Sequence, residues 1–316
     1  MKILVTPTSM KPDADTAALR KLKAYADEVV FNPTGKPLSG DALVELLKDC
    51  DGYLAGVDSI TEDVMKQCPK LKAISRYGVG YDRVDVPAAK KLGIQVAVTP
   101  GANSQAVAEL AFGMLIAIAR QIPYLHMSTI EGKWVRTSGC ELYGKTIGII
   151  GLGAIGKRLA ACCKGFNMKV LAYDPFINEE YCKENDIIVS ELDDLYAESD
   201  FITLHLPLMD STVHMIDAAA IAKMKKGAIL VNASRGGIID EAAAYEALVS
   251  GQLGGLGLDA FEQEPPEASP LFGLDNVVLT PHAGAHTAEA VVNMATMAVD
   301  NLIDILDGKE CRYVLK

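Results

Sequence analysis

Short apolar runs alternate with stretches of helical periodicity along almost the whole chain. In the first third the apolar runs read as strands at residues 3–5, 28–31, 53–55, 71–75 and 94–98. Helical patterns fill the intervals, around residues 14–26, 41–47, 61–66 and 86–92. Apolar strands separated by helices are typical of a parallel sheet that is covered by helices on both faces.

A second alternating series follows a long apolar stretch. Residues 103–122 read as one helix, with Asn103 and Ser104 as capping residues, long enough to pass from one domain to another. Seven further strands are predicted at residues 146–150, 169–173, 187–189, 201–204, 228–231, 256–259 and 277–279. Seven strands make a complete doubly wound domain, and the last helical run, 287–306, can return to the first domain. We therefore predict an α/β protein of two doubly wound parallel-sheet domains.

Composition narrows the class of partner. Half of the 316 residues are hydrophobic and the formal net charge is −11, so we expect a globular chain that repels nucleic acid and anionic membranes. The most apolar stretch, 106–119, is shorter than the ~20 residues of a membrane span. The seven cysteines include no C-x-x-C pair, which favours reduced thiols in a cytoplasmic protein and no metal site.

The strongest local motif is G-x-G-x-x-G, formed by Gly151, Gly153 and Gly156. It follows a predicted strand and opens a predicted helix, which is the context that dinucleotide binding requires. Gly151 allows a tight turn, Gly153 lets the backbone approach a pyrophosphate, and Gly156 lets helix and strand pack closely. We expect the amides of Ala154 and Ile155, at the helix start, to hold the phosphates.

Asp174 selects between the two nicotinamide dinucleotides. It ends the next strand, 23 residues after Gly151 (174 − 151), where a carboxylate binds the adenosine ribose hydroxyls. The same carboxylate repels a 2′-phosphate, and the next three residues supply no cation. The sequence therefore predicts NAD rather than NADP.

Three later turns each carry a polar residue beyond a predicted strand: Arg235, Glu264 and His282. Ligands of open α/β sheets bind beyond the carboxyl ends of the strands, so these turns are expected to converge. Histidine is suited to move a proton to or from the oxygen of a 2-oxo or 2-hydroxy acid, and a neighbouring carboxylate orients the ring. Arginine grips a carboxylate with two parallel hydrogen bonds.

Each of these residues has a structural alternative. A histidine after a proline, an arginine in a loop and a glutamate before Pro265-Pro266 all occur in ordinary turns. Their shared placement favours catalysis, with His282 as acid/base, Glu264 as its partner and Arg235 as the substrate clamp.

The whole set of motifs resembles the D-isomer-specific 2-hydroxyacid dehydrogenase family, most closely its phosphoglycerate dehydrogenase-like branch. The resemblance rests on SRYGVGYD (75–82), the helix 103–120, GKTIGIIGLGAIG (144–156) and the three turns. It implies a Rossmann NAD domain at residues 99–286 and a smaller flavodoxin-like substrate domain at 1–98 plus 287–316, with the active site in the cleft between them.

The resemblance also implies further contacts. Backbone amides around Gly78, Val79 and Gly80 would bind the substrate carboxylate. Leu206 and Pro207 would lie near adenine, Ala233 and Ser234 beside the nicotinamide half, and Asp259 near the nicotinamide amide. Members are usually homodimers paired through the NAD domain, and residues 130–140, with Trp134, match the arm that such dimers exchange.

The substrate stays open between phosphorylated and unphosphorylated acids. Arg76 and Arg136 match phosphate-binding positions of phosphoglycerate dehydrogenases, but they could equally be structural ion-pair partners. A third arginine of that branch would fall near Gly56 and is absent, while Asp58 places a negative charge nearby. The alternatives to 3-phosphoglycerate are glyoxylate, hydroxypyruvate or another short 2-oxo acid.

Two smaller questions stay open: the role of His286, and whether the protein is an enzyme or a co-repressor. His286 stands where many relatives have serine, and either lines the cleft or caps the last helix. An NAD-sensing co-repressor is a different functional class on the same fold. The complete catalytic set argues against it.

Overall fold

The computed structural model describes residues 1–316 as two compact units. Unit 1 comprises Met1–Asn103 and His286–Lys316, and unit 2 comprises Ser104–Ala285. The first division comes a few residues after position 98, where the sequence predicted it. The boundary lies later because Val98 is bound to the end of the chain in unit 1: its amide donates to Tyr313 O at 3.2 Å and its carbonyl accepts from Asn301 Nδ2 at 3.0 Å.

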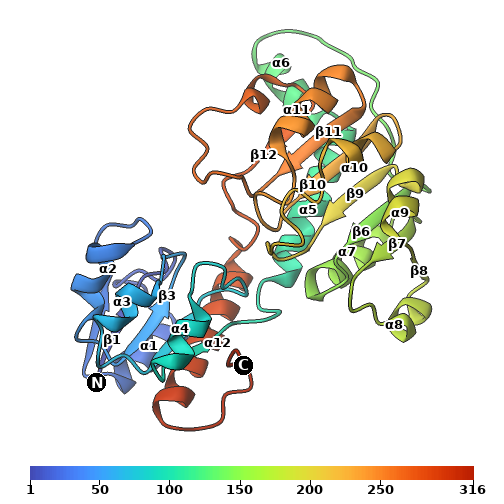
Figure 1. Cartoon of the computed structure of the whole chain (residues 1–316). Coiled ribbons are helices and arrows are strands. Elements are labelled where there is room, and N and C mark those ends of the chain that lie inside the picture. Colours follow the sequence, from blue (N-terminus) through green and yellow to red (C-terminus); the bar gives the residue numbers. More distant parts are fainter. The chain divides into compact units, whose positions relative to one another are not determined.

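Unit 1 is built on one parallel sheet in the order β2-β1-β3-β4-β5, drawn mainly in blue and cyan in Figure 1. Its elements are β1 (Lys2–Val5), α1 (Ala17–Tyr25), β2 (Glu28–Phe31), α2 (Gly40–Leu47), β3 (Gly52–Ala55), α3 (Glu62–Lys66), β4 (Ala73–Arg76), α4 (Val86–Lys91), β5 (Gln95–Ala97) and α12 (Ala288–Leu306). This is the flavodoxin-like strand order, in agreement with the prediction.

Alternate side chains of each strand enter different cores of unit 1. Leu4 of β1 packs with α2, α3 and α4, whereas Ile3 and Val5 pack with α1 and α12 on the other face. Successive side chains of a strand point to opposite faces of the sheet, so a strand whose residues are all apolar is buried on both faces. Helix α12 thus belongs to unit 1, as its position after a complete domain suggested.

Unit 2 holds a seven-stranded parallel sheet in the order β12-β11-β10-β9-β6-β7-β8. Its elements are α5 (Ser104–Ala119), α6 (Ile122–Ile130), β6 (Thr146–Ile150), α7 (Ala154–Lys164), β7 (Lys169–Tyr173), α8 (Glu179–Glu184), β8 (Ile187–Val189), α9 (Leu192–Glu198), β9 (Phe201–Leu204), α10 (Ala218–Lys223), β10 (Ala228–Asn232), α11 (Glu241–Ser250), β11 (Leu253–Leu258), the 3-10 turn Pro270–Gly273 and β12 (Val277–Leu279). Helices α5, α7 and α8 share one core, and α9, α10 and α11 share the core on the other face.

The long helix predicted for residues 103–122 is α5, which ends three residues early, and the helix α6 that comes after it was not predicted. Helix α5 ends at Ala119, Gln121 adopts a left-handed backbone with φ of 51°, and α6 starts at Ile122. The predicted capping role of Asn103 is wrong, since its Oδ1 is buried without a hydrogen-bond partner and Ser104 lies inside the helix. No single helix has both the length and the hydropathy to cross a membrane, although α5 and α6 together reach them across a 62° bend.

Candidate active site

The sheet order of unit 2 brings the predicted turns to one edge. Strands β10, β11 and β12 are neighbours, and their carboxyl ends lead into the turns of Arg235, Glu264 and His282. In the sheet, strand β9 lies between β10 and β6, and the glycine motif follows β6. The β6–β9 boundary is the point where the strand order reverses, which is where open α/β sheets bind their ligands.

The three glycines occupy different environments. Gly151 has φ of 96°, and a Cβ there would lie 2.5 Å from His205 O. A Cβ on Gly156 would lie 2.2 Å from Gly151 O, so this residue permits the close packing of α7 on β6. Nothing lies within 4 Å of a Cβ built on Gly153, which leaves the backbone at the start of α7 accessible to a phosphate.

Asp174 is fixed beside this loop by two backbone hydrogen bonds. Its Oδ2 accepts from Leu152 N and its Oδ1 from Phe176 N, both at 2.8 Å. The carboxylate is thus held at the carboxyl end of β7, where its remaining lone pairs can accept ribose hydroxyls. Glycine loop, helix start and carboxylate together fit NAD, which would supply the site with a hydride donor or acceptor.

The other cofactor contacts implied by the resemblance lie on the same edge of the sheet. Leu206 and Pro207 follow β9, and Thr212 Oγ1 donates to Pro207 O at 2.8 Å. Ala233 and Ser234 follow β10 and are buried, and Ser234 donates to Asn232 Oδ1 through its amide and its hydroxyl. Their contacts with adenine and nicotinamide stay predictions.

His205 was not singled out from the sequence, although it directly follows the predicted strand 201–204 and precedes Leu206-Pro207. Its amide donates to Ile150 O at 2.8 Å, its Nε2 lies 3.0 Å from Thr203 Oγ1, and its Nδ1 is buried without a partner. Burial lowers the pKa of His205 to about 4. A neutral imidazole therefore supports the turn against which Gly151 packs.

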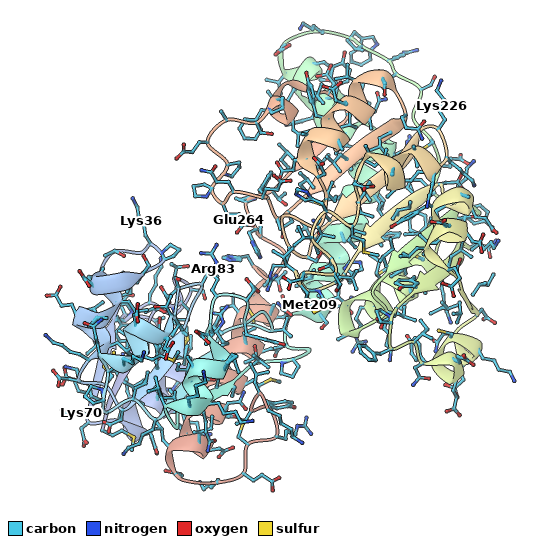
Figure 2. The ribbon with its side chains drawn as sticks, in the orientation of Figure 1. Lys36, Lys70, Arg83, Met209, Lys226 and Glu264 are labelled. Atoms are coloured by element: carbon cyan, nitrogen blue, oxygen red, sulfur yellow. The ribbon has the colours of Figure 1, made fainter.

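His282 and Glu264 form the predicted pair. His282 Nδ1 lies 2.9 Å from Glu264 Oε1, which also accepts from Phe261 N at 3.3 Å. Figure 2 labels Glu264 on the loop after β11. Because the carboxylate engages Nδ1, it favours the ring orientation and tautomer that leave Nε2 for a ligand.

Arg235 lies on a turn that is tightly braced to the Glu264 loop. Its Nη1 donates to Ser234 O at 2.7 Å, and Asn232 Nδ2 donates to Arg235 O at 2.7 Å. A Cβ on Gly236 would lie 1.8 Å from Phe261 O. The backbones that carry the arginine and the glutamate therefore touch, and only glycine fits at that crossing.

Asp259 anchors the loop that carries His282. The residue is only 2% exposed, and its carboxylate accepts from Thr280 Oγ1 at 2.6 Å, Ala283 N at 2.7 Å and Gly284 N at 2.8 Å. These bonds explain how the loop after β12 keeps its shape beside β11. The predicted contact of Asp259 with the nicotinamide amide stays a prediction.

In unit 1, Arg76 points into the protein. It is 6% exposed, and its guanidinium donates to Gly80 O at 3.0 Å and Ala55 O at 2.9 Å, bracing the 78–80 loop. Gly78 N donates to Thr99 Oγ1 at 2.9 Å, whereas Val79 is exposed.

Asp58 is buried in the same unit. Its carboxylate accepts from Tyr53 Oη and Leu38 N, both at 2.7 Å, and also from the Thr6 hydroxyl. It is thus a structural acceptor inside the domain.

The structure excludes one of the two roles considered for His286. His286 does not cap α12, because Thr287 Oγ1 accepts from Ala290 N in that role.

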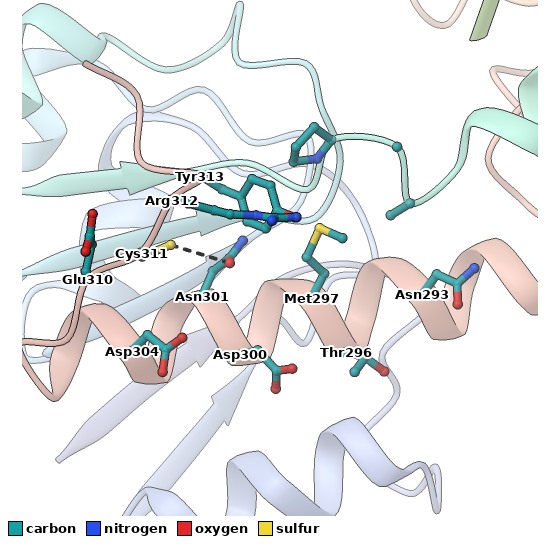
Figure 3. Close-up of a pocket in the computed structure, with 13 residues that line it drawn as sticks. Asn293, Thr296, Met297, Asp300, Asn301, Asp304, Glu310, Cys311, Arg312 and Tyr313 are labelled. Atoms are coloured by element: carbon teal, nitrogen blue, oxygen red, sulfur yellow. Dashed lines mark hydrogen bonds between the residues drawn. The ribbon is translucent and has the colours of Figure 1, made fainter. Parts of the chain in front are cut away.

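A cavity of about 1010 Å³ in unit 1 lies along α12 and residues 310–313 (Figure 3), where Cys311 Sγ donates to Asn301 Oδ1 at 3.5 Å. None of the predicted site residues lines it.

Comparison with known proteins agrees with this geometry. The family model for the NAD-binding domain of D-isomer specific 2-hydroxyacid dehydrogenases matches residues 112–284. A D-3-phosphoglycerate dehydrogenase of Methanocaldococcus jannaschii is 44% identical over 88% of this chain and 54% of its own length. A hydroxypyruvate reductase of Thermotoga maritima is 46% identical over 81% of this chain and 85% of its own length.

Solved structures agree as well. The apo-structure of D-lactate dehydrogenase from Escherichia coli superposes with a TM-score of 0.85 at 32% identity over the full length of both chains. The chain spans about half the length of the phosphoglycerate dehydrogenases it matches, and most of the length of the reductase. The strand order, the NAD motif and the matched model together show that this chain belongs to the D-isomer-specific 2-hydroxyacid dehydrogenase family.

Proposed function

We propose that the protein is an NAD-dependent D-2-hydroxyacid dehydrogenase that interconverts a short 2-oxo acid and its D-2-hydroxy acid. The observation that carries the proposal is the 2.9 Å contact between His282 Nδ1 and Glu264 Oε1, at the sheet edge that also holds the NAD motif. Histidine is the side chain that most often acts as a general acid or base, and Glu264 holds this ring in place.

The residues divide the chemistry as follows. Protonated His282 donates its Nε2 proton to the substrate oxygen as the 2-oxo acid is reduced, and neutral His282 takes that proton back in the oxidation. Glu264 holds the ring and balances its positive charge, while Arg235 binds the substrate carboxylate. NAD supplies the hydride acceptor or donor.

We assign the substrate to the short, unphosphorylated 2-oxo acids, of which hydroxypyruvate and glyoxylate are the first candidates. The orientation of Arg76 supports this, because its guanidinium is buried on two backbone carbonyls of its own domain. Gly56 carries no side chain at the position where phosphoglycerate dehydrogenases have an arginine, and its amide donates to Thr6 Oγ1 at 2.8 Å. The similarity of the chain to a hydroxypyruvate reductase also supports an unphosphorylated substrate.

We further propose a homodimer that pairs through α6 and the arm after it. This segment exposes several apolar side chains, among them Ile130 at 65% and Trp134 at 82%. Exposed apolar groups in such a series mark protein contacts, and the resemblance to the family indicates a second copy as the occupant. Light scattering on the wild type and on Trp134→Glu would test this; a monomeric wild type would refute it.

The deciding experiment measures NADH oxidation with pyruvate, glyoxylate, hydroxypyruvate, 2-oxoglutarate and 3-phosphohydroxypyruvate side by side. Hydroxypyruvate or glyoxylate is expected to give the highest kcat/KM. A preference for the phosphorylated acid would overturn the substrate assignment and would point to Arg76 and Arg136 as phosphate ligands. Tight NADH binding without turnover of any acid would favour the co-repressor alternative.

A variant tests the role of the histidine. His282→Ala is expected to lower kcat by ~10²–10⁴-fold while NADH binding stays within error, because general acid–base catalysis contributes about that much. Normal turnover in this variant would remove His282 from the mechanism.

A further inference from the structure

Three ionisable side chains gather beside the catalytic turns, outside the pair already described. They are His214, from the segment between β9 and α10, Glu241, the first residue of α11, and Glu262, from the loop after β11. Glu262 N donates to Glu241 Oε1 at 2.7 Å, and Glu241 N donates to Glu262 Oε1 at 3.1 Å. His214 Nε2 lies 3.2 Å from the same Glu262 oxygen.

This reciprocal pair joins the two backbones that carry the chemistry. Glu262 precedes Glu264 by two residues, and Glu241 opens the helix that follows the Arg235 turn. The third segment is tied to the same turn, because His214 N donates to Gly237 O at 2.7 Å. The glutamate pair therefore lies next to the crossing of Gly236 and Phe261, because Glu262 directly follows Phe261 in the chain.

The electrostatics fit a structural clamp. Glu262 Oε1 accepts from the first amide of α11, where the positive end of the helix dipole stabilises a carboxylate. Burial raises the pKa of the Glu241 carboxyl, the charge of Glu262 adds to this shift, and the Glu262 amide opposes it. The side chains of His214 and Glu262 are partly exposed, so the contact between them contributes little to stability and the backbone hydrogen bonds dominate.

We infer that Glu262 is a positioning residue, which holds the Glu264 loop against the Arg235 turn through its reciprocal hydrogen bonds with Glu241. It acts through Glu264 and does not touch the substrate. The inference rests on the proposed function, because it assigns Glu262 a role in aligning the proposed acid/base pair.

The test compares Glu262→Ala with Glu262→Gln. The alanine variant loses the acceptor for Glu241 N, and a displacement of about 1 Å at Glu264 is expected to lower kcat by roughly 10- to 100-fold. The dissociation constant of NADH and the substrate KM should change by less than about threefold, because neither site uses Glu262. Glutamine keeps an oxygen acceptor and is expected to restore kcat to within about threefold of the wild type. Glu246→Ala, on the exposed face of α11, is the matched control.

Two outcomes overturn the inference. One is an unchanged kcat in Glu262→Ala; the other is a glutamine variant as slow as the alanine variant. A separate readout does not need turnover: in protein labelled at its five histidines, the ring signals of His282 should shift in Glu262→Ala and not in Glu262→Gln. Unchanged ring signals of His282 in both variants refute the clamp, even if the wild type reduces no acid. A wild type that reduces no acid counts, by itself, only against the proposed function.

Discussion

The backbone crossing at Gly236 allows a quantitative prediction about the catalytic geometry. A Cβ at this position would lie 1.8 Å from Phe261 O, whereas an ordinary van der Waals contact begins at 3.4 Å. Gly236→Ala must therefore separate the two loops by about 1.6 Å (3.4 − 1.8). Since a misplacement of 1 Å can cost about 10²-fold in rate, kcat/KM is expected to fall by at least about 100-fold.

The assay is steady-state NADH oxidation with the best acid of the panel, together with NADH binding measured by fluorescence. NADH affinity should stay close to that of the wild type, because the glycine motif lies at the turn from β6 to α7, away from this crossing. Gly273→Ala is the matched control, since its Cβ meets nothing within 4 Å and its backbone has no positive φ. A Gly236→Ala protein with wild-type kcat/KM would show that the contact between the loops does not set the geometry of the site.

Three further predictions concern residues that support the site. Asp259→Ala should lower the free energy of unfolding by at least about 2 kcal/mol in urea titrations, because it leaves three donors without their acceptor; an unchanged midpoint would contradict this. The pKa of His205 is about 4 in the fold against its usual 6.5, so its protonation favours the unfolded chain and destabilises the protein by up to roughly 3 kcal/mol as the pH falls from 6.5 to 4. His205→Gln removes this loss, and its stability relative to the wild type should rise by about 2 kcal/mol between pH 7.5 and pH 5; parallel pH profiles would refute the argument. Asp174→Ala should raise the KM for NADH about tenfold and narrow the preference over NADPH, since a hydrogen bond to a charged group contributes about 1.5 kcal/mol; an unaltered NADH/NADPH ratio would exclude the assigned role.

Local patterns determined which segments form strands and helices. Gly151, Gly153 and Gly156 could be interpreted because a strand precedes them and a helix follows, and both of these elements are local properties of the chain. The start of α6 was missed, although the sequence marks it: the polar residues Arg120 and Gln121 interrupt the apolar run, and Pro123 stands in the first turn of α6, where proline is tolerated in a helix.

The candidate catalytic residues could be predicted as a set, whereas their geometry could not. Strands that are consecutive in the sequence tend to be neighbours in a sheet, so the turns after β10, β11 and β12 were expected on one edge of the sheet. The 2.9 Å contact of His282 with Glu264 and the crossing of Gly236 with Phe261 depend on how the loops fold, which no spacing encodes.

Side-chain direction was decided by tertiary structure alone. Arg76 stands at a position that suggests anion binding, yet two backbone carbonyls in its own domain take its guanidinium. Asn103 stands where a cap was expected, yet its Oδ1 is buried without a partner. The sequence by itself determined the two sheets, the NAD motif and the candidate triad, because these follow from periodicity and residue type. The roles of Arg76, Asp259, His205 and Glu262 depended on tertiary structure, because a polar side chain takes the partners that the fold places within hydrogen-bonding distance.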